Sequence, residues 1–479
     1  MEEFILKKLN YINGEWLGED FETIDVLNPA TGKVIGQIPN ATTEHTNSAI
    51  EAAHQAFLEW SKKTSNERAT YLKKLHSLIL LNKEELARTI TLEMGKPLQE
   101  ARGEIDYANS FIEWFAEEAK RIYGETIPAS ATDKRIMVLK QPVGVVGAIT
   151  PWNFPAAMIT RKMAPALAAG CTIVIKPSEL TPLTAVKIVE LCEEAGFPKG
   201  VVNLITGDPK EIGKEMMGNE KVKKVTFTGS TRVGKLLMEQ GAKHIKKLSL
   251  ELGGHAPIII LDDANVEKAV KGVIGSKFRN AGQTCICGNR IYIQPSIYKE
   301  FMERFIQEVE KLNVGNGLEE NVDIGPLINE AAYFKVISHI EDAVSKGAVV
   351  ESGGQGEEIG KTYFYKPTIL TNVNHSMLVM NEETFGPVAP IQLVESDEEA
   401  IEYANNSPYG LAAYVFSESL SRGLKVVEGL QFGIVGWNDG APSTFQAPFG
   451  GMKESGLGRE GGRQGLDAFL EIKYVSIGL

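Results

Sequence analysis

The amino-acid sequence of 479 residues predicts an α/β protein built on a doubly wound parallel sheet. From residue 143 onward, short apolar runs alternate with segments whose apolar residues follow a helical period. Each of the first four runs is followed by a loop with proline or glycine and then by a helical segment, the βαβ repetition of parallel sheets. Because such crossovers are right-handed, the loops gather at the carboxyl edge of the sheet, where ligands bind. The predicted strands are 143–149, 171–176, 201–205, 224–228 and 256–261.

The region before this sheet is predicted to begin with strands and to continue with helices. Within the first 30 residues, Asn13-Gly14 stands between apolar flanks, which is typical of a tight hairpin. From 44 to 60 the apolar residues recur at the spacing of one helix face. Longer helices are predicted over roughly 66–92 and 97–119.

A second α/β alternation runs from about 256 to 440 and predicts a second α/β domain. Its helices are expected near 264–280, 296–312 and 330–347. The last segment, 470–477, alternates like a strand and has no obvious partner after it. Such an unpaired edge should be covered by another strand or segment.

Composition excludes several classes of protein. Hydrophobic residues make up 43%, enough for large cores, and the net charge of −12 disfavours nucleic acid as a partner. The four cysteines are too sparse for a disulfide framework, and their spacing predicts no metal site. Residues 1–9 do not read as a signal peptide, and no apolar run is long enough to span a membrane. We therefore expect a soluble protein of a reducing compartment, the cytoplasm.

Cys285 is the first candidate for chemistry, at the end of the stretch Asn280-Ala-Gly-Gln-Thr-Cys285. A thiol that follows small and flexible residues at a helix end can be exposed in a cleft and gain thiolate character. The alternative is that the residue is a small member of the core, which is the commoner fate of a cysteine.

Glu251 is the candidate general base, in Leu248-Ser-Leu-Glu-Leu-Gly-Gly254. Its leucine neighbours at the end of an apolar strand predict a desolvated carboxyl with a raised pKa. The alternative is a solvent-facing acid on an amphipathic strand.

Asn153 is the candidate oxyanion donor, in Thr150-Pro-Trp-Asn-Phe-Pro155 directly after the strand 143–149. Two prolines and two aromatic residues make the loop stiff, so its amide could be held toward an oxyanion. The alternative is an asparagine that serves as a turn residue or helix cap.

Two further loops at the same edge suggest a nucleotide. In Phe227-Thr-Gly-Ser-Thr-Arg-Val-Gly234 the pattern Gly-Ser-x-x-x-Gly opens a helix N-terminus, which favours phosphate, although the usual Gly-x-Gly-x-x-Gly fingerprint is absent. In Lys176-Pro-Ser-Glu179 the two charged residues could hold ribose hydroxyls. The first loop could equally be a simple glycine turn, and the second could be a solvated charged turn.

Taken together and in order, these motifs resemble the aldehyde dehydrogenase superfamily over essentially the full length of the chain. Seven motifs in family order make an accidental likeness very improbable. They are Pro151-Trp-Asn-Phe-Pro155, Lys176-Pro-Ser-Glu179, Phe227-Thr-Gly-Ser230, Glu251-Leu-Gly-Gly254, Gly282-Gln-Thr-Cys285, Glu382-Glu-Thr-Phe-Gly-Pro387 and Pro448-Phe-Gly-Gly451.

The resemblance implies a role for each motif. Cys285 is then the nucleophile, Glu251 the general base, and Asn153 with the Cys285 backbone N–H the oxyanion hole. NAD is the implied cofactor, with NADP as an alternative. Lys176 and Glu179 would hold the adenosine ribose, Gly229 and Ser230 the pyrophosphate, and Glu383 and Phe385 the nicotinamide half. The other implied cofactor contacts are Thr150, Pro151, Trp152, Ser178, Gly207, Gly213, Phe227, Thr228, Val233 and Leu252.

The same resemblance implies a division into parts. Residues 1–119 and 143–254 would form the dinucleotide-binding domain, and 255–458 the catalytic domain. Residues 120–142 and 459–479 would form the bridging and oligomerisation element. In the family a strand such as 470–477 joins the sheet of a neighbouring subunit, which implies a homodimer or homotetramer.

Within the superfamily the chain is most similar to succinate-semialdehyde dehydrogenases. In those enzymes residues that match Arg161, Arg279 and Ser443 hold the remote carboxylate, a suitable partner for a charge-assisted clamp. The alternative is that either arginine pairs with a structural acid. The loop 438–446 and Trp437 depart from the expected pattern at the substrate mouth, so glutarate semialdehyde is the main rival substrate.

Two alternative functions remain: a relative that binds nucleotide without catalysis, and a phosphate-ester reductase of the same fold. The presence of Cys285, Glu251 and Asn153 argues against both, since a reductase needs no water-activating glutamate. Cys285 and Cys287 are also a candidate reversible disulfide, because residues two apart lie about 5.5–7 Å apart at Cα. Related semialdehyde dehydrogenases with Cys-x-Cys are thought to switch in this way. The alternative is that Cys287 is a buried residue that points away from the site.

Overall fold

The computed structural model describes residues 6–7 and 9–479. The prediction that residues 1–9 are not a signal peptide therefore falls almost wholly outside the described part of the chain. Within that part, no helix combines the length and apolar character that a membrane crossing needs.

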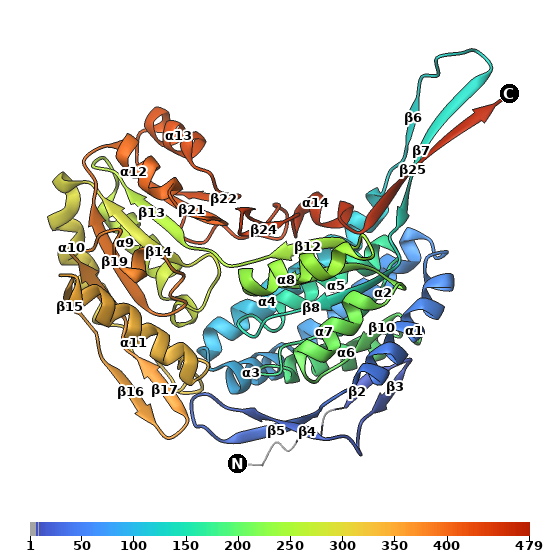
Figure 1. The fold of residues 1–479 in the computed structure, drawn as a ribbon, viewed down its shortest axis with the longest axis horizontal. Helices are drawn as coiled ribbons and strands as arrows, with labels where there is room; N and C mark the ends of the chain where they lie inside the picture. Colours follow the sequence, from blue (N-terminus) through green and yellow to red (C-terminus); the bar gives the residue numbers. More distant parts are fainter. Residues whose placement is uncertain (1–5, 8) are drawn as a thin grey trace.

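An eight-stranded sheet forms the first half of the fold (Figure 1). Its five central strands are parallel and confirm the first four predicted strands, while the small strands at its two ends run antiparallel. In spatial order the strands are β24 (Gly456–Leu457), β12 (Lys247–Glu251), β11 (Val222–Thr228), β8 (Val145–Ile149), β9 (Thr172–Lys176), β10 (Val202–Leu204), β2 (Asn10–Ile12) and β3 (Glu15–Leu17).

Helices cover both faces of this sheet, as the doubly wound prediction requires. Successive strand residues face opposite ways, so Val145 belongs to one apolar core and Val146 to the other. One core is closed by α2 (Ser65–Leu81), α3 (Lys83–Met94), α4 (Leu98–Glu118), α5 (Ala157–Ala169) and α6 (Leu183–Glu194). The other is closed by α1 (Thr43–Trp60), α7 (Pro209–Gly218) and α8 (Thr231–Ala242).

The predicted helix over 66–92 is wrong in one respect, because it breaks into α2 and α3 at Asn82. The Asn82 backbone is not helical, and its side-chain Nδ2 donates to the Leu78 carbonyl oxygen at 2.8 Å. A short amide side chain competes with the helix ladder for backbone groups, and this ends α2. The hairpin at Asn13-Gly14 and the helices over 44–60 and 97–119 are confirmed.

A seven-stranded sheet forms the second half and confirms the predicted second α/β unit. All its strands are parallel except the edge strand β15. In spatial order they are β15 (Val349–Ser352), β18 (Thr368–Thr371), β19 (Val388–Leu393), β14 (Gly288–Ile293), β13 (Ala256–Ile260), β21 (Ala412–Phe416) and β22 (Ile434–Trp437). The helices are α9 (Val266–Lys277), α10 (Pro295–Val309), α11 (Glu330–Ser345), α12 (Asp397–Asn405) and α13 (Leu420–Gly429), with η3 (Leu378–Met380).

The C-terminal strand β25 (Leu470–Gly478) is not unpaired, which corrects the prediction. It runs antiparallel to β7 (Lys134–Pro142), more than 300 positions earlier, and β6 (Glu125–Ile127) completes this sheet. The three strands project from the body as an arm (Figure 1). The other short elements are β1 (Leu6–Lys7), β4 (Thr23–Leu27), β5 (Val34–Pro39), β16 (Gly356–Ile359), β17 (Thr362–Tyr365), β20 (Tyr409–Gly410), β23 (Met452–Lys453), η1 (Ala119–Arg121) and α14 (Gly462–Asp467).

Candidate active site

The carboxyl ends of four adjacent parallel strands bring most of the predicted site residues together. Ile149, which ends β8, is in register with Lys176 on β9 and with Phe227 on β11. Thr228 on β11 is in register with Glu251, the last residue of β12. The candidate motifs therefore start from one edge of the sheet, as predicted.

Cys285 lies in the loop between η2 (Arg279–Gly282) and β14. The loop turns sharply, because Asn280, Ala281 and Gly282 all have positive φ, at 54°, 55° and 74°. A Cβ at residue 282 would collide with the Gly386 carbonyl oxygen, so this position needs glycine. The turn leaves Cys285 partly exposed, whereas the other three cysteines are buried.

The protein environment disfavours the Cys285 thiolate. Desolvation raises the pKa of the thiol to about 12, and the negative charges of Glu383 and Glu251 act in the same direction. The positive charges of Arg161 and Arg279 oppose this shift. At neutral pH the thiol form dominates, so attack by sulfur requires a base that removes its proton.

Glu251 is the buried carboxyl that the sequence predicts. Its side chain is only 2% exposed, and neither oxygen has a hydrogen-bond partner among the described residues. Burial raises the pKa of this carboxyl well above its usual value, and the negative charge of Glu460 raises it further. Arg161, Lys162 and Arg459 oppose the rise. A buried carboxyl with no hydrogen-bond partner among the described residues is suited to take up and release protons.

Arg161 does pair with a structural acid, which was the alternative to a carboxylate-binding role. Its guanidinium lies 2.9 Å from Glu460, and Lys162 Nζ lies 2.6 Å from the other oxygen of the same carboxylate. All three side chains are at least 95% buried. The guanidinium also lies 4.0 Å from the centre of the Phe449 ring, and its Nε has no partner among the described residues.

Sequence reasoning missed Glu460, although one signal pointed to it. Arg161 and Lys162 are adjacent on α5, in a sequence region that is otherwise apolar. Two neighbouring buried cations need an acid from elsewhere in the chain. The partner lies about 300 positions away in the sequence, so no local pattern identifies it.

Arg279 and Ser443 are both only partly buried. The Arg279 guanidinium lies 5.5 Å from the Phe154 ring centre, and its Nε lacks a partner among the described residues. Ser443 Oγ lies 2.6 Å from the hydroxyl of Tyr107, a residue that sequence reasoning missed. The Tyr107 ring packs edge-on against Phe111, which in turn lies 5.7 Å from Arg161.

Asn153 is buried beside the loop that carries Cys285. Its Nδ2 donates to the Gln283 carbonyl oxygen at 3.0 Å, two residues before the thiol. The amide has a second N–H, which remains for another acceptor. Asn153 is not a helix cap, because the N-cap residue of α5 is Ala156, which makes no side-chain cap hydrogen bond.

The loop after β11 is partly committed to internal contacts. The Gly229 N–H donates to the Glu251 carbonyl oxygen at 3.0 Å, and the Thr228 hydroxyl accepts from Lys162 Nζ. Ser230 is exposed and caps α8 by accepting from the Val233 N–H at 3.4 Å. The groups of this loop still open to a ligand are therefore the Ser230 hydroxyl and the N–H groups of α8 that precede Val233.

The predicted ribose-binding residues lie on two separate segments. Lys176 is buried at the end of β9 and forms an ion pair with Glu179 at 2.9 Å. On the other segment, Glu383 Oε1 accepts from the Gly254 N–H at 3.1 Å, and burial raises the pKa of this carboxyl to about 7. Phe385 has a positive φ of 56°, and its ring lies edge-on to Trp152 at 5.6 Å.

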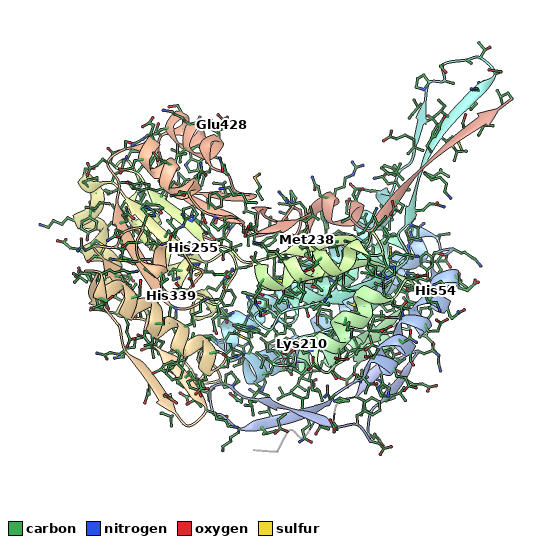
Figure 2. All side chains as sticks on the ribbon, in the orientation of Figure 1. His54, Lys210, Met238, His255, His339 and Glu428 are labelled. Carbon is green, nitrogen blue, oxygen red and sulfur yellow. The ribbon has the colours of Figure 1, made fainter. Side chains whose placement is uncertain are left out.

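Helix α11 holds the segment that carries Glu383. Lys335 donates to the Glu383 carbonyl oxygen, and His339 Nδ1 lies 3.1 Å from the Thr384 hydroxyl. Figure 2 shows that His339 and His255 both lie in the second half of the molecule. Desolvation lowers the pKa of His339 to about 4, so the ring is neutral at physiological pH.

The remaining predicted cofactor residues are mostly small or buried. Thr150 presents a buried hydroxyl without a partner among the described residues. Ser178 Oγ accepts from the Leu180 N–H at 3.2 Å, and Gly207 packs against the Ala41 backbone. Gly213 borders open space, while Leu252 packs against Gly234.

Comparison with known proteins identifies the scaffold. The sequence profile described as the aldehyde dehydrogenase family matches residues 16–475. The chain belongs to this family. It is 54% identical to the succinate-semialdehyde dehydrogenase (NADP(+)) of Escherichia coli, over 98% of this chain and 97% of that protein. It is also 54% identical to a glutarate-semialdehyde dehydrogenase of Pseudomonas putida, over 99% and 98%. The crystal structure of a succinate-semialdehyde dehydrogenase from Burkholderia pseudomallei superposes with a TM-score of 0.97 at 50% identity, over 99% and 98%.

In this aldehyde dehydrogenase Trp437 packs away from the 438–446 loop that follows it. Its indole lies against Gly423 of α13 and donates to the Ser417 carbonyl oxygen at 3.1 Å. The expectation that this bulky residue alters the substrate mouth therefore lacks support from its contacts. Residues of the loop itself do reach the site, since Ser443 contacts Tyr107.

Cys287 is buried in a polar setting. Its Sγ lies 3.2 Å from Lys277 Nζ and 3.3 Å from the Lys277 carbonyl oxygen, and Lys277 Nζ also donates to Asn289 at 2.7 Å. Both thiols of the Cys285–Cys287 pair are free. The disulfide stays a prediction, and its formation would require Cys287 to leave its contacts with Lys277.

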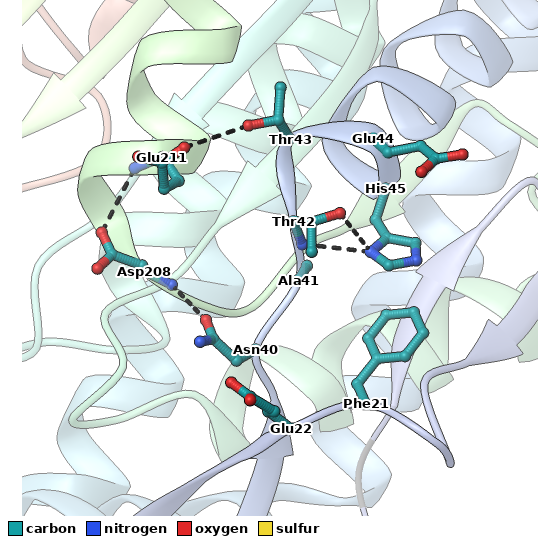
Figure 3. Close-up of a pocket in the computed structure, with 10 residues that line it drawn as sticks. All are labelled: Phe21, Glu22, Asn40, Ala41, Thr42, Thr43, Glu44, His45, Asp208 and Glu211. Atoms are coloured by element: carbon teal, nitrogen blue, oxygen red, sulfur yellow. Dashed lines mark hydrogen bonds between the residues drawn. The ribbon is translucent and has the colours of Figure 1, made fainter.

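A surface pocket of about 690 Å³ is lined by Phe21, Glu22, residues 40–45, Asp208 and Glu211 (Figure 3). Its polar groups already bind one another: Asn40 accepts from the Asp208 N–H at 2.9 Å, and Thr43 donates to Glu211 at 3.3 Å. None of Cys285, Glu251 or Asn153 lines it. We assign it no part in the chemistry.

Proposed function

We propose that this aldehyde dehydrogenase oxidises succinate semialdehyde to succinate with NAD. The observation that carries the proposal is the grouping of a partly exposed thiol, a buried carboxyl without partners and a held amide. Cys285 and Glu251 interact electrostatically, and Asn153 bonds the backbone two residues before the thiol. The identity to semialdehyde dehydrogenases over nearly the whole chain supports the same conclusion.

The residues at the sheet edge fit a nicotinamide dinucleotide. The N-terminus of α8 with exposed Ser230 suits a pyrophosphate, and Glu179 in the loop after β9 suits ribose hydroxyls. Glu383 and Phe385 would hold the nicotinamide half. The buried Thr150 hydroxyl, which lacks a protein partner among the described residues, is a further group that a ligand could satisfy. When bound, the dinucleotide supplies the hydride acceptor.

The first half of the reaction follows from the chemistry of Cys285. Its thiol proton passes to bulk hydroxide or to a base other than Glu251, and the sulfur bonds to the aldehyde carbon. The carbonyl oxygen becomes an oxyanion, which the free Asn153 N–H and the Cys285 backbone N–H stabilise. Loss of hydride from the same carbon leaves a thioester on Cys285.

The second half of the reaction uses Glu251 as general base. Its carboxylate removes a proton from a water molecule, which attacks the thioester carbon. The carbon–sulfur bond breaks, the acid leaves, and the Cys285 thiol is restored. A general base at this position therefore favours an acid as the product.

The charge balance around Arg161 supports a substrate with a second carboxylate. Arg161 and Lys162 share the single carboxylate of Glu460, while burial lowers the pKa of Lys162. A substrate carboxylate would neutralise the remaining positive charge, and Arg279 with Ser443 would complete its clamp.

Replacing Arg161 or Arg279 with alanine is expected to lower kcat/KM for succinate semialdehyde far more than kcat/KM for butyraldehyde. Loss of one charge-assisted contact should cost about 1.5–3 kcal/mol, or roughly 10- to 150-fold in kcat/KM. The measurement is kcat/KM for both aldehydes by NADH absorbance, with Arg304→Ala on the exposed face of α10 as a control. Equal losses on the two aldehydes would show that neither arginine binds the carboxylate.

Glutarate semialdehyde is the second candidate substrate, because the Pseudomonas putida relative with that name is 54% identical. The two substrates differ by one methylene group, which a pocket discriminates by about 1–3 kcal/mol. The wild-type kcat/KM for the C4 and C5 semialdehydes decides between them.

NAD is expected to be preferred over NADP, because the Glu179 carboxylate would repel a 2′-phosphate. Lys176 lies 2.9 Å from Glu179 and offsets part of this repulsion, so we expect a preference of about tenfold in kcat/KM. Glu179→Ala should remove it, while Glu194→Ala on the exposed face of α6 should not. A wild-type kcat/KM that is equal or higher with NADP would contradict the assignment.

We also propose that the arm of β25, β7 and β6 joins a second copy of the chain in a homodimer or homotetramer. Its exposed apolar side chains include Ile127, Leu139, Ile472 and Tyr474. Such residues on an open sheet edge are normally covered. Sedimentation equilibrium should give a mass of two or four chains, and a monomer would refute the proposal.

A further inference from the structure

Three charged residues at four-residue intervals lie behind the candidate oxyanion hole. Lys96 precedes α4, and Glu100 and Glu104 follow on one face of that helix. The Lys96 and Glu104 side chains are completely buried, and Glu100 is partly so. None is a member of the proposed chemistry, yet burial of charge is unfavourable unless each group is paired and hydrogen-bonded.

Lys96 holds the backbone of Asn153. Its Nζ donates to the Asn153 carbonyl oxygen at 2.8 Å and to Glu104 at 2.6 Å. The same ammonium lies 3.7 Å from the centre of the Phe154 ring, the next residue in the loop. Three directional contacts from one rigid cation restrict the Asn153 peptide in position and orientation.

Glu104 holds the segment that follows Asn153. Its second carboxylate oxygen accepts from the Ala156 N–H at 2.9 Å and the Ala157 N–H at 3.3 Å, at the start of α5. No side chain of α5 itself caps this helix end. Glu104 therefore ties the first turn of α5 and Lys96 to one carboxylate.

Glu100 holds the turn that leads to Cys285, whose N–H is the second proposed oxyanion donor. Its carboxylate accepts from the Asn280 N–H at 2.9 Å, in the left-handed turn that leads to Cys285. The Asn280 side chain then donates to the Asn153 carbonyl oxygen at 3.2 Å and to the Gln283 carbonyl oxygen at 3.1 Å. The Asn153 loop and the Cys285 loop are thus tied to each other and to the same side of α4.

We infer that Lys96, Glu100 and Glu104 are positioning residues that hold the Asn153 amide and the Cys285 N–H in the relative geometry an oxyanion requires. The inference rests on the proposed function. Stabilisation by fixed donors depends on their placement, and loss of one donor typically lowers kcat by about 10²–10³. Displacement of a donor by about 1 Å can lower the rate by about 10².

The test compares two reactions of the same thiol in Lys96→Met and Glu104→Gln. Aldehyde oxidation passes through an oxyanion, whereas alkylation of Cys285 by iodoacetamide forms none. We expect kcat to fall by about 30- to 300-fold in each variant. The second-order rate of Cys285 alkylation and the Kd for NAD should stay within about threefold of wild type, because neither needs the oxyanion donors.

A second arm asks whether Lys96 acts through Asn153. In an Asn153→Ala background the donor is already lost, so adding Lys96→Met should lower kcat by less than about threefold. Lys96→Arg, which keeps the charge, should recover part of the activity of Lys96→Met. Asp106→Asn is the matched control, since Asp106 lies on the same helix in an exposed ion pair with Lys83.

Each outcome separates this inference from the proposed function. If wild type oxidises neither succinate semialdehyde nor butyraldehyde, the proposed function fails and the inference fails with it. If wild type is active and the variants keep their kcat, the positioning role alone is wrong. A parallel loss of alkylation and oxidation, or fully multiplicative losses in the double variant, would also overturn it. Should Lys96→Met not fold, the near-isosteric Glu104→Gln and Glu100→Gln decide by the same measurements.

Discussion

Cys285→Ala is expected to lower the rate of aldehyde oxidation by about a thousandfold or more, with the Kd for NAD within about twofold of wild type. The thiol is the only cysteine in the described chain that is partly exposed, and it follows the left-handed turn at Asn280 and Ala281. Without sulfur there is no thiohemiacetal and therefore no thioester. Steady-state NADH formation and fluorescence titration with NAD measure the two quantities.

The matched control is Cys192→Ala. Cys192 is buried in α6 and contacts Met163 rather than the site. We expect full activity from this variant, with some loss of thermal stability from the small cavity. Residual oxidation by Cys285→Ala above about one-thousandth of the wild-type rate would exclude a covalent role for this thiol.

The position of the site could be predicted from the sequence because it depends on strand ends. Apolar runs located β8, β9 and β11, and Glu251 was expected at the end of an apolar strand, which is β12. In a parallel sheet the residues after such strands meet at one edge. The desolvation of Glu251 was predictable for the same reason, since its leucine neighbours lie on a buried strand. Local pattern and topology together were sufficient for these features.

The partners of the charged residues could not be predicted, because they come from distant parts of the chain. Glu460 pairs with Arg161 and Lys162 across about 300 positions, and Lys96 reaches Asn153 across 57. The pairing of β25 with β7 is equally remote in sequence. Hydrophobic periodicity indicates that a residue is buried, but it does not indicate which charge it meets.

Glu251→Gln is expected to leave the first turnover largely intact and to slow every later one by about 10²–10⁴-fold. The amide keeps the size of the side chain but cannot remove a proton from the water that attacks the thioester. Rapid mixing with aldehyde and NAD should therefore give a burst of about one NADH per active site, followed by slow turnover. The burst also requires that another base or bulk hydroxide can take the Cys285 proton.

The pH dependence gives an independent check on the same residue. Burial and the negative charge of Glu460 raise the pKa of Glu251, and only its carboxylate form activates water. In wild type, hydrolysis should therefore accelerate as pH rises through this raised pKa, and the acceleration should disappear in Glu251→Gln. Glu460→Gln removes the negative charge that raises this pKa, so it should move the pH profile of hydrolysis toward lower pH.

As pH rises, activity should increase through the Glu251 carboxylate, whereas the contribution of Glu251 to thermal stability should decrease. An acid whose pKa is higher in the folded state than in the unfolded state loses stability as pH rises above the unfolded value. Glu251→Gln removes this term, so its Tm should equal that of wild type near pH 4 and exceed it by a growing margin toward pH 8. Slow turnover without a burst would assign Glu251 to the attack by sulfur rather than to hydrolysis. A Tm below that of wild type at pH 8 would contradict the burial of an unpaired carboxyl at this position.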